Sequence, residues 1–256
     1  MKVYEIVFSP TGGTLKVADV VAKALASDVI QVDLTNAETD FSTVSFCPED
    51  VCIVAVPSYG GRVPATAISR LRQLSGGQAS AVLIAVYGNR AYEDTLLELK
   101  DTLLAADFRC IAGIAAVAEH SIMRVFAAGR PNETDLEELK IFAAKIQDKI
   151  KTGDIAGDLA VPGNAPYRQY SGVPLKPAAG KKCTKCGLCA TRCPVGAIPI
   201  NAPDETDSTK CISCMRCVSI CPSKARAVNP LLLAVVTQKM KEACAKDKKN
   251  EVWLSL

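Results

Sequence analysis

Eight of the twelve cysteines lie in two short runs that share one spacing. Each run has the pattern C-x2-C-x2-C-x3-C-P, as CTKCGLCATRCP and then CISCMRCVSICP. Three closely spaced thiolates can bind three irons of a cubane cluster, while the fourth cysteine of each run binds the other cluster. The spacing therefore predicts two 4Fe-4S clusters: cluster I held by Cys183, Cys186, Cys189 and Cys221, and cluster II held by Cys211, Cys214, Cys217 and Cys193.

Zinc sites and disulfides are the other uses of clustered cysteines. Zinc sites also contain C-x2-C pairs, but zinc gives no reason for a third cysteine at the same step followed by C-P. The N-terminus MKVYEIVFSP lacks the long apolar region of a signal peptide, so we expect a cytoplasmic protein with reduced thiols. The remaining cysteines, Cys47, Cys52, Cys110 and Cys244, have no partner spacing. Cys52 and Cys110 lie in expected strands and are expected as small core residues.

A second stretch whose residue types could bind a ligand is SPTGGT, residues 9–14, between an apolar run and a helical pattern. Its glycines allow close approach of the backbone, its hydroxyls offer hydrogen bonds, and a following helix N-terminus favours an anion. It matches neither G-x4-G-K-[ST] nor G-x-G-x-x-G. We therefore expect a phosphate-binding loop, with a glycine-rich turn capped by threonine as the other interpretation.

The first 150 residues alternate strand-like and helix-like patterns, which indicates a parallel sheet with right-handed crossovers. The expected strands are Val3–Phe8, Asp28–Leu34, Val51–Val56, Ala81–Tyr87 and Cys110–Val117. The expected helices are Thr14–Ser27, Pro64–Leu74, Tyr92–Ala106 and Glu133–Ile150. We predict a doubly wound α/β sheet of order 2-1-3-4-5, in which ligands bind at the carboxyl ends of the strands.

Composition divides the chain into four parts. We expect an α/β domain over 1–155, a Pro/Gly-rich linker over 156–180, the cysteine-rich domain over 181–230, and a C-terminal helix and tail over 231–256. The helix, expected over Pro230–Cys244, is too short to span a membrane. A net charge of +3 argues against a nucleic-acid partner, and 49% hydrophobic residues indicate a globular chain.

Two further loops at the expected carboxyl edge, PSYGGRVP and YGNRAYED, combine glycine with tyrosine and arginine. Together with SPTGGT they resemble the flavodoxin family over residues 1–150. The resemblance implies FMN, with its phosphate bound by Ser9, Thr11, Gly12, Gly13 and Thr14. It implies contacts to the flavin ring from Pro57, Ser58, Tyr59, Gly60, Gly61, Gly88, Asn89, Arg90 and Tyr92. Residues 181–229 resemble bacterial two-cluster ferredoxins, a small α+β fold.

His120, the only histidine, follows the fifth expected strand and so lies at the same edge. One hypothesis is that it tunes or protonates a flavin there. The other is an ordinary surface or capping histidine. Arg124 and Arg130 lie nearby in the sequence, but the spacing does not decide whether they face the site.

The whole chain resembles flavodoxin–ferredoxin fusions of anaerobic bacteria and archaea. The resemblance implies electron transfer between FMN and two 4Fe-4S clusters, with a redox protein or a small-molecule acceptor as partner. The other function considered is an FMN-dependent reductase of a small molecule, or an NAD(P)H-linked oxidoreductase, fed through the clusters. The cysteine-rich segment has more cations than acids, which suits either charge compensation or an acidic partner. The oligomeric state stays open, a homodimer included.

Overall fold

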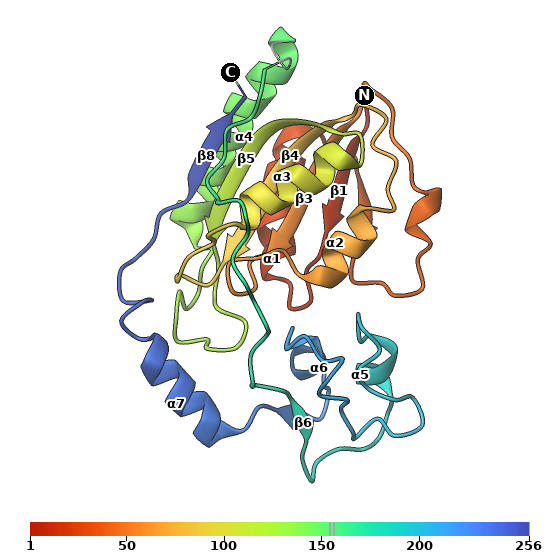
Figure 1. Ribbon diagram of the computed structural model, residues 1–256, viewed down its shortest axis with the longest axis vertical. Helices are drawn as coiled ribbons and strands as arrows, with labels where there is room; N and C mark the ends of the chain where they lie inside the picture. The colour runs from red at the N-terminus through yellow and green to blue at the C-terminus, as the bar shows by residue number, and fades with distance from the viewer. Residues whose placement is uncertain (154, 156, 256) are drawn as a thin grey trace.

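The computed structural model describes residues 1–153, 155 and 157–255 (Figure 1). Its main sheet has six strands in the order β2-β1-β3-β4-β5-β8. The first five are parallel, so the predicted order 2-1-3-4-5 is confirmed. The strands are β1 (Val3–Val7), β2 (Val29–Asp33), β3 (Val51–Pro57), β4 (Ser80–Tyr87), β5 (Arg109–Val117) and β8 (Glu251–Leu254).

Helices cover both faces of the sheet, as a doubly wound fold requires. Helices α1 (Gly13–Leu25) and α4 (Glu133–Thr152) pack on one face, and α2 (Ala65–Leu71) and α3 (Thr95–Ala105) on the other. Strands β3 and β4 are buried along almost their whole length, which explains their continuous apolar sequences. A 3-10 turn, Phe41–Thr43, lies between β2 and β3.

Strand β8 lies in the C-terminal segment 231–256, which was expected to form only a helix and a tail. It pairs antiparallel with β5, and its Trp253 packs against Tyr92 with ring centroids 6.2 Å apart. The pairing joins segments about 140 residues apart, so no local pattern predicts it. It turns the expected five-stranded sheet into a six-stranded one.

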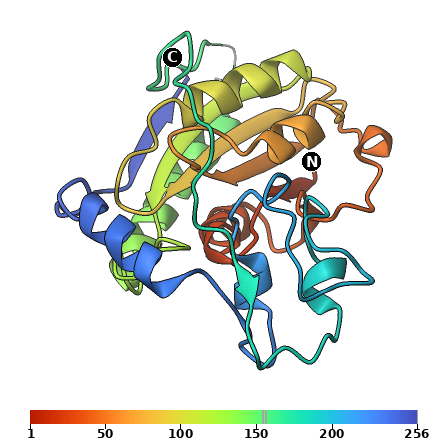
Figure 2. The same cartoon turned by 60° about the horizontal axis from the view of Figure 1, so that its bottom comes forward.

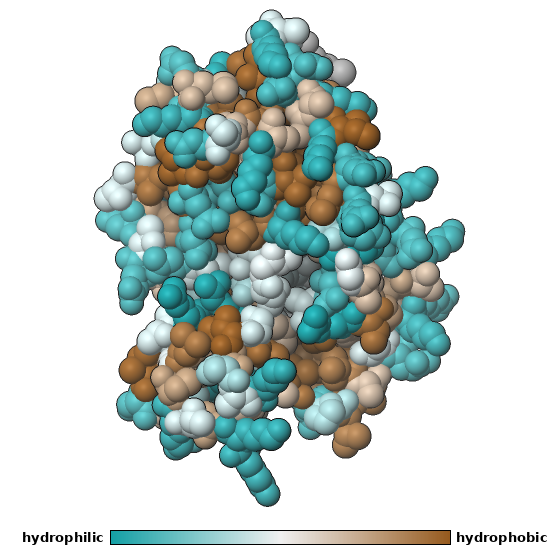
Figure 3. Space-filling model, turned by 180° about the vertical axis from the view of Figure 1, so that it is seen from behind, coloured by the Kyte–Doolittle hydropathy of each residue, from teal (hydrophilic) through white to brown (hydrophobic). Residues whose placement is uncertain are grey.

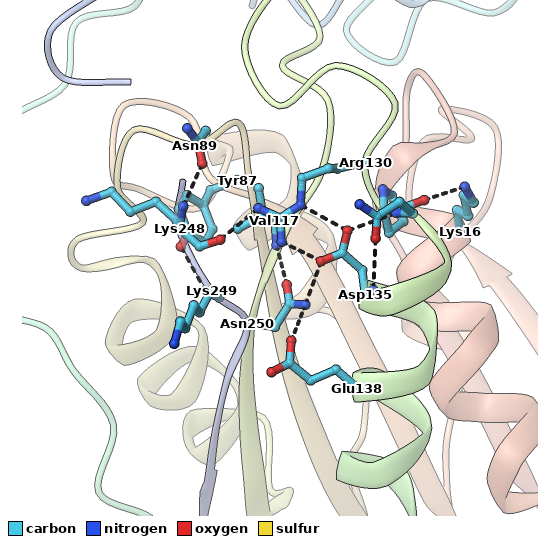
Figure 4. Close-up of polar contacts among 12 residues, drawn as sticks. Lys16, Tyr87, Asn89, Val117, Arg130, Asp135, Glu138, Lys248, Lys249 and Asn250 are labelled. Carbon is cyan, nitrogen blue, oxygen red and sulfur yellow. Dashed lines mark hydrogen bonds and ion pairs between the residues drawn. The ribbon is translucent and has the colours of Figure 1, made fainter. Parts of the chain in front are cut away.

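The residues before β8 are fixed to the sheet by a polar network (Figure 4). The Asn250 amide nitrogen donates to Asp135 and Glu138, and its oxygen accepts from the Val117 backbone at 2.9 Å. The guanidinium of Arg130 pairs with Asp135 and donates to the Lys248 carbonyl at 2.7 Å. Arg130 is therefore a structural residue that anchors the C-terminal segment.

The cysteine-rich part is a small module with two short helices, α5 (Leu188–Thr191) and α6 (Arg216–Ser219), and a two-stranded sheet. Strand β6 (Ala178–Ala179), inside the segment expected as linker, pairs antiparallel with β7 (Arg226–Ala227). Helix α7 (Pro230–Met240) ends four residues before the predicted Cys244. The module and α7 both lie at the carboxyl edge of the main sheet (Figure 1, Figure 2).

The linker is held along the α/β domain rather than left as a free tether. The Asp94 carboxylate accepts from the Asn164 and Arg168 backbone amides at 2.9 and 2.7 Å, and Lys100 donates to the Leu159 carbonyl at 2.7 Å. The expected boundary between residues 155 and 156 falls beside positions 154 and 156, which lie outside the described residues. Within the described part of the chain, no helix is both long and apolar enough to cross a membrane.

Candidate functional site

The eight clustered cysteines surround two separate small cavities in the module. One cavity is lined by Cys183, Cys186, Cys189 and Cys221. The other is lined by Cys193, Cys211, Cys214 and Cys217. Each cavity thus combines three cysteines of one run with the last cysteine of the other, which is the grouping expected for two cubane clusters.

The two runs share a backbone conformation that wraps each cavity. The residues on both sides of the second cysteine have positive φ in each run: Lys185 and Gly187 in the first, Ser213 and Met215 in the second. Only glycine adopts this region without cost, so three of these four positions carry backbone strain. The repeated conformation shows that both loops are shaped alike around their cavities.

Backbone amides point at the sulfur atoms from within the module. The Ala197 amide lies 3.3 Å from Cys193 Sγ, and the Ala225 amide lies 3.3 Å from Cys221 Sγ. Hydrogen bonds, led by that of Ser223, lower the pKa of the Cys221 thiol. Such donors favour thiolates, the form that binds iron.

An arginine lies against each cavity. Arg226, 3% exposed, places Nε 3.2 Å from Cys189 Sγ, and its other nitrogens donate to the Thr206 hydroxyl and to the carbonyls of Pro203 and Glu205. Arg216 lines the second cavity, donates to the Thr35 hydroxyl and leaves a buried Nε without a partner among the described residues. A buried cation needs a counter-charge, and an anionic iron–sulfur cluster would supply one.

No three histidine, cysteine, aspartate or glutamate side chains in residues 1–153, 155 and 157–255 converge as a single metal ion requires. Each of the two cavities is lined by four cysteines, the number of thiolates that a cubane cluster binds.

A third cavity, of about 380 Å³, lies at the carboxyl edge of the main sheet. Its walls are the loops after β1, β3, β4 and β5, the linker, the second cysteine run and α7. This volume is in the range of cofactor sites, and the position is where doubly wound sheets bind ligands. The surface is hollowed between the sheet domain and the parts below it when the molecule is seen from behind (Figure 3).

The loop after β1 leaves free space for an anion. Gly12 has φ of +91° and a Cβ there would meet nothing within 4 Å, while Thr11, Gly13 and Thr14 line the cavity. Ser9 is not among the residues that line the cavity, and its hydroxyl accepts from the Leu15 amide at 2.9 Å. The first amides of α1 have no acceptor inside the helix and carry the positive end of its dipole, so a phosphate fits here.

The loops after β3 and β4 line the cavity with glycine backbone and with an aromatic side chain. Pro57, Ser58, Tyr59 and Gly60 line the cavity, as do Gly88 and Arg90. A Cβ on Gly60 would lie 2.2 Å from the Tyr170 ring, so glycine here permits the linker to cover the site. Burial raises the pKa of Tyr59 well above its usual range, so its phenol stays neutral.

Other predicted ring-contact residues are not among those lining the cavity. The Asn89 side chain is buried and instead holds the C-terminal segment, donating to the Cys244 and Lys246 carbonyls and accepting from the Lys248 amide. Tyr92 packs between Tyr87 and Trp253 and donates to Glu251 at 2.9 Å. Gly61 makes room for Glu93, which a Cβ would meet at 1.8 Å.

His120 lines the cavity with its imidazole packed against Gly88. Its Nδ1 accepts from the Ile122 and Met123 amides, both at 3.2 Å, so the proton of the neutral ring sits on Nε2. Burial lowers the pKa of His120 to about 4. The ring is therefore neutral near pH 7 and acts there as a hydrogen-bond donor rather than as an acid. Arg124 is exposed, is not among the residues that line the cavity, and pairs with Glu119.

Part of the cavity wall comes from segments that the loop motifs did not indicate. The linker contributes Arg168, Tyr170, Val173 and Leu175, the second cysteine run Ile212 and Ser213, and α7 Val236 and Met240. The Ser213 hydroxyl is buried and has no partner among the described residues, so it is available to a bound group. Two tyrosines in the otherwise Pro/Gly-rich linker, Tyr167 and Tyr170, were a local sign that the segment packs.

Residues 178–222 match the family model of the 4Fe-4S dicluster domain. Streptococcus pneumoniae TIGR4 flavodoxin is 23% identical over 57% of this chain and 99% of its own, with a TM-score of 0.41. Flavodoxin from Fusobacterium nucleatum, a structure with bound flavin mononucleotide, is 14% identical over 60% and 98%, with a TM-score of 0.37. Rubredoxin oxygen:oxidoreductase from Desulfovibrio gigas is 16% identical over 60% and 37%, with a TM-score of 0.42. Among curated proteins, no sequence matches this chain.

The strand order by itself defines a flavodoxin-type α/β domain. Residues 178–222 match a 4Fe-4S dicluster domain. The chain thus joins an α/β domain with a flavodoxin-type strand order to a segment that is similar to a 4Fe-4S dicluster domain.

Proposed function

We propose that this chain is an electron-transfer iron–sulfur flavoprotein that holds FMN in the cavity at the sheet edge and two 4Fe-4S clusters in the cysteine module. The observation that carries the proposal is the loop between Cys211 and Cys214. Its Ile212 lines both the cavity of about 380 Å³ and the cavity of the second cysteine group, and its Ser213 lines the former. A single short loop thus separates the two sites.

When bound, FMN exchanges one or two electrons and each cluster exchanges one, so their combination couples two-electron to one-electron carriers. The protein positions these groups and excludes water from between them. Tyr59, Ile212 and Leu175 form an apolar wall at the junction. Ser213 and His120 offer hydrogen-bond donors to a flat polar ring, while the loop of Thr11 to Thr14 binds its phosphate.

The domain assignment follows from the same arrangement. We assign 1–155 to FMN binding, 181–230 to the clusters, the intervening segment to the linker and 231–256 to the C-terminal helix and tail. The cluster ligands are the two groups of four cysteines, with cluster I at Cys183, Cys186, Cys189 and Cys221. We place the protein in the cytoplasm, where its thiols stay reduced.

The test is anaerobic purification with FMN and iron–sulfur reconstitution, followed by measurement of flavin, iron and sulfide. The proposal expects one flavin, about eight irons and about eight sulfides per chain, from the two cubane clusters. Cys214→Ser should remove one cluster and leave flavin content unchanged, while Cys47→Ser is the matched control outside the module. Four irons in the unaltered protein, or flavin below one tenth of the chain concentration, would contradict the proposal.

A further inference from the structure

A second, larger opening lies beside the cavity at the sheet edge, with a volume of about 1010 Å³. It runs between the start of α2, the linker and the loop that leads into the second cysteine run. We propose that this opening, here called the junction groove, binds an organic phosphate of nucleotide size. Its volume is at the upper end of the range for small-molecule sites, so a single inorganic ion would not fill it.

The charge on the groove walls favours an anion. Four cations line it, Arg62, Arg72, Lys176 and Lys210, against one carboxylate, Glu98. Glu98 is already neutralised, because it accepts two hydrogen bonds from the Arg62 guanidinium at 2.6 and 2.8 Å. The other three cations are therefore left to attract a ligand.

These three cations differ in how freely they can reach a ligand. In the described part of the chain, no carboxylate pairs with Arg72 or Lys176. Lys176 Nζ donates to the Cys211 carbonyl at 2.5 Å, which fixes its ammonium at the groove wall. Lys210 has a long ion pair with partly buried Asp207 at 3.5 Å. Guanidinium and ammonium groups together bind phosphate oxygens by charge-assisted hydrogen bonds.

The rest of the lining suits an organic group attached to the phosphates. Val63, Ile68 and Ile212 offer apolar surface, and Tyr59 and Tyr170 offer rings on which a flat heterocycle can stack. Hydroxyls come from Ser69, Ser171, Ser208 and Thr209. An apolar and aromatic wall beside a cationic one matches a nucleotide, which has a flat base at one end and phosphates at the other.

The groove is continuous with the cavity at the sheet edge. Tyr59, Tyr170, Val173 and Ile212 line both. A ligand in the groove would therefore lie against the same side chains as a bound flavin, a consequence that rests on the proposed function. Binding itself does not depend on that function, because the groove residues belong to this chain alone.

The test uses ADP, which has no redox chemistry, and the full chain saturated with FMN so that the sheet-edge cavity is filled. Isothermal titration calorimetry at low ionic strength should show one ADP site. Arg72→Ala and Lys176→Gln should each weaken the ADP affinity at least fivefold. Lys145→Ala, at an exposed position of α4, should leave the affinity unchanged. Affinity should fall with added salt, since the contacts are ionic, and pyrophosphate should compete.

Absence of ADP binding up to about 5 mM, a concentration that corresponds to very weak binding, overturns the proposal. Equal effects of Arg72→Ala and Lys145→Ala on the ADP affinity overturn it as well. Displacement of ADP by FMN would place the nucleotide in the other cavity and overturn it as well. Flavin and iron contents measured on the same samples separate this result from the proposed function: ADP can bind where cluster assembly fails, and clusters can assemble where ADP does not bind.

Discussion

Arg226 provides a sharp test of how the module handles the charge of a cluster. Its guanidinium is buried, lies 3.2 Å from Cys189 Sγ, and is otherwise held by carbonyls and one hydroxyl. Reduction of a cluster adds one negative charge, and a fixed cation beside a ligand stabilises that charge. Replacing Arg226 with glutamine should therefore make cluster I harder to reduce.

The size of the effect follows from the contact. A hydrogen bond to a charged group contributes about 1.5–3 kcal/mol. For a one-electron couple, about 1.4 kcal/mol corresponds to about 59 mV. Because the contact exists in both oxidation states, only part of it appears as a shift, and we expect the potential to fall by roughly 50–100 mV. Arg226→Lys keeps the charge, so its cluster potential should fall by less than half as much as that of Arg226→Gln.

The assay is an anaerobic redox titration followed by EPR. Of the two proposed clusters, only one should change its potential, since Arg226 contacts Cys189 of one cysteine group. Arg192→Gln, which removes an exposed cation from the same module, is the control. Arg226→Gln with full iron content and both potentials within about 10 mV of the unaltered protein would refute the reasoning; if that variant assembles no cluster, the same criterion applies to Arg226→Lys.

Three further predictions concern the α/β domain. Asn250→Ala removes hydrogen bonds to Val117, Asp135 and Glu138 and should lower the free energy of unfolding by about 1–3 kcal/mol in urea, whereas a change below about 0.5 kcal/mol would contradict the anchoring role. His120 has a folded pKa of about 4, below its usual value near 6.5. Only the unfolded chain binds a proton there between these values, so FMN-free protein should lose about 2 kcal/mol from pH 7 to pH 5. His120→Asn should remove that part of the loss, and an unchanged pH profile would argue against a neutral buried ring. Asp94→Ala frees the linker amides of Asn164 and Arg168 and should speed proteolysis between residues 158 and 175 at least fivefold, with exposed Asp28→Ala as control; equal rates would show that the linker is held by other contacts.

Local sequence patterns were sufficient to predict the parallel strands and the helices between them. Strands such as β3 and β4 are continuous apolar runs because both faces are covered, and α1 repeats its buried positions at helical spacing. The two cysteine runs predicted the grouping around two cavities, because the spacing within each run limits which sulfurs can share a cluster. These features depend on residues near one another in the chain.

Contacts between distant segments were decided only by the tertiary structure. Asn89 and Arg130 sit in loops at the carboxyl edge, but hydrogen bonds to residues 244–248 turn them into anchors for the C-terminal segment. The linker looked unstructured by composition, yet the Asp94 carboxylate and the packing of Tyr170 on Gly60 bring it over the cavity. The sequence by itself determined the two domains and the residue types at their sites. Which segments close those sites depended on partners 70 to 160 residues away, and a local pattern carries no information about such contacts.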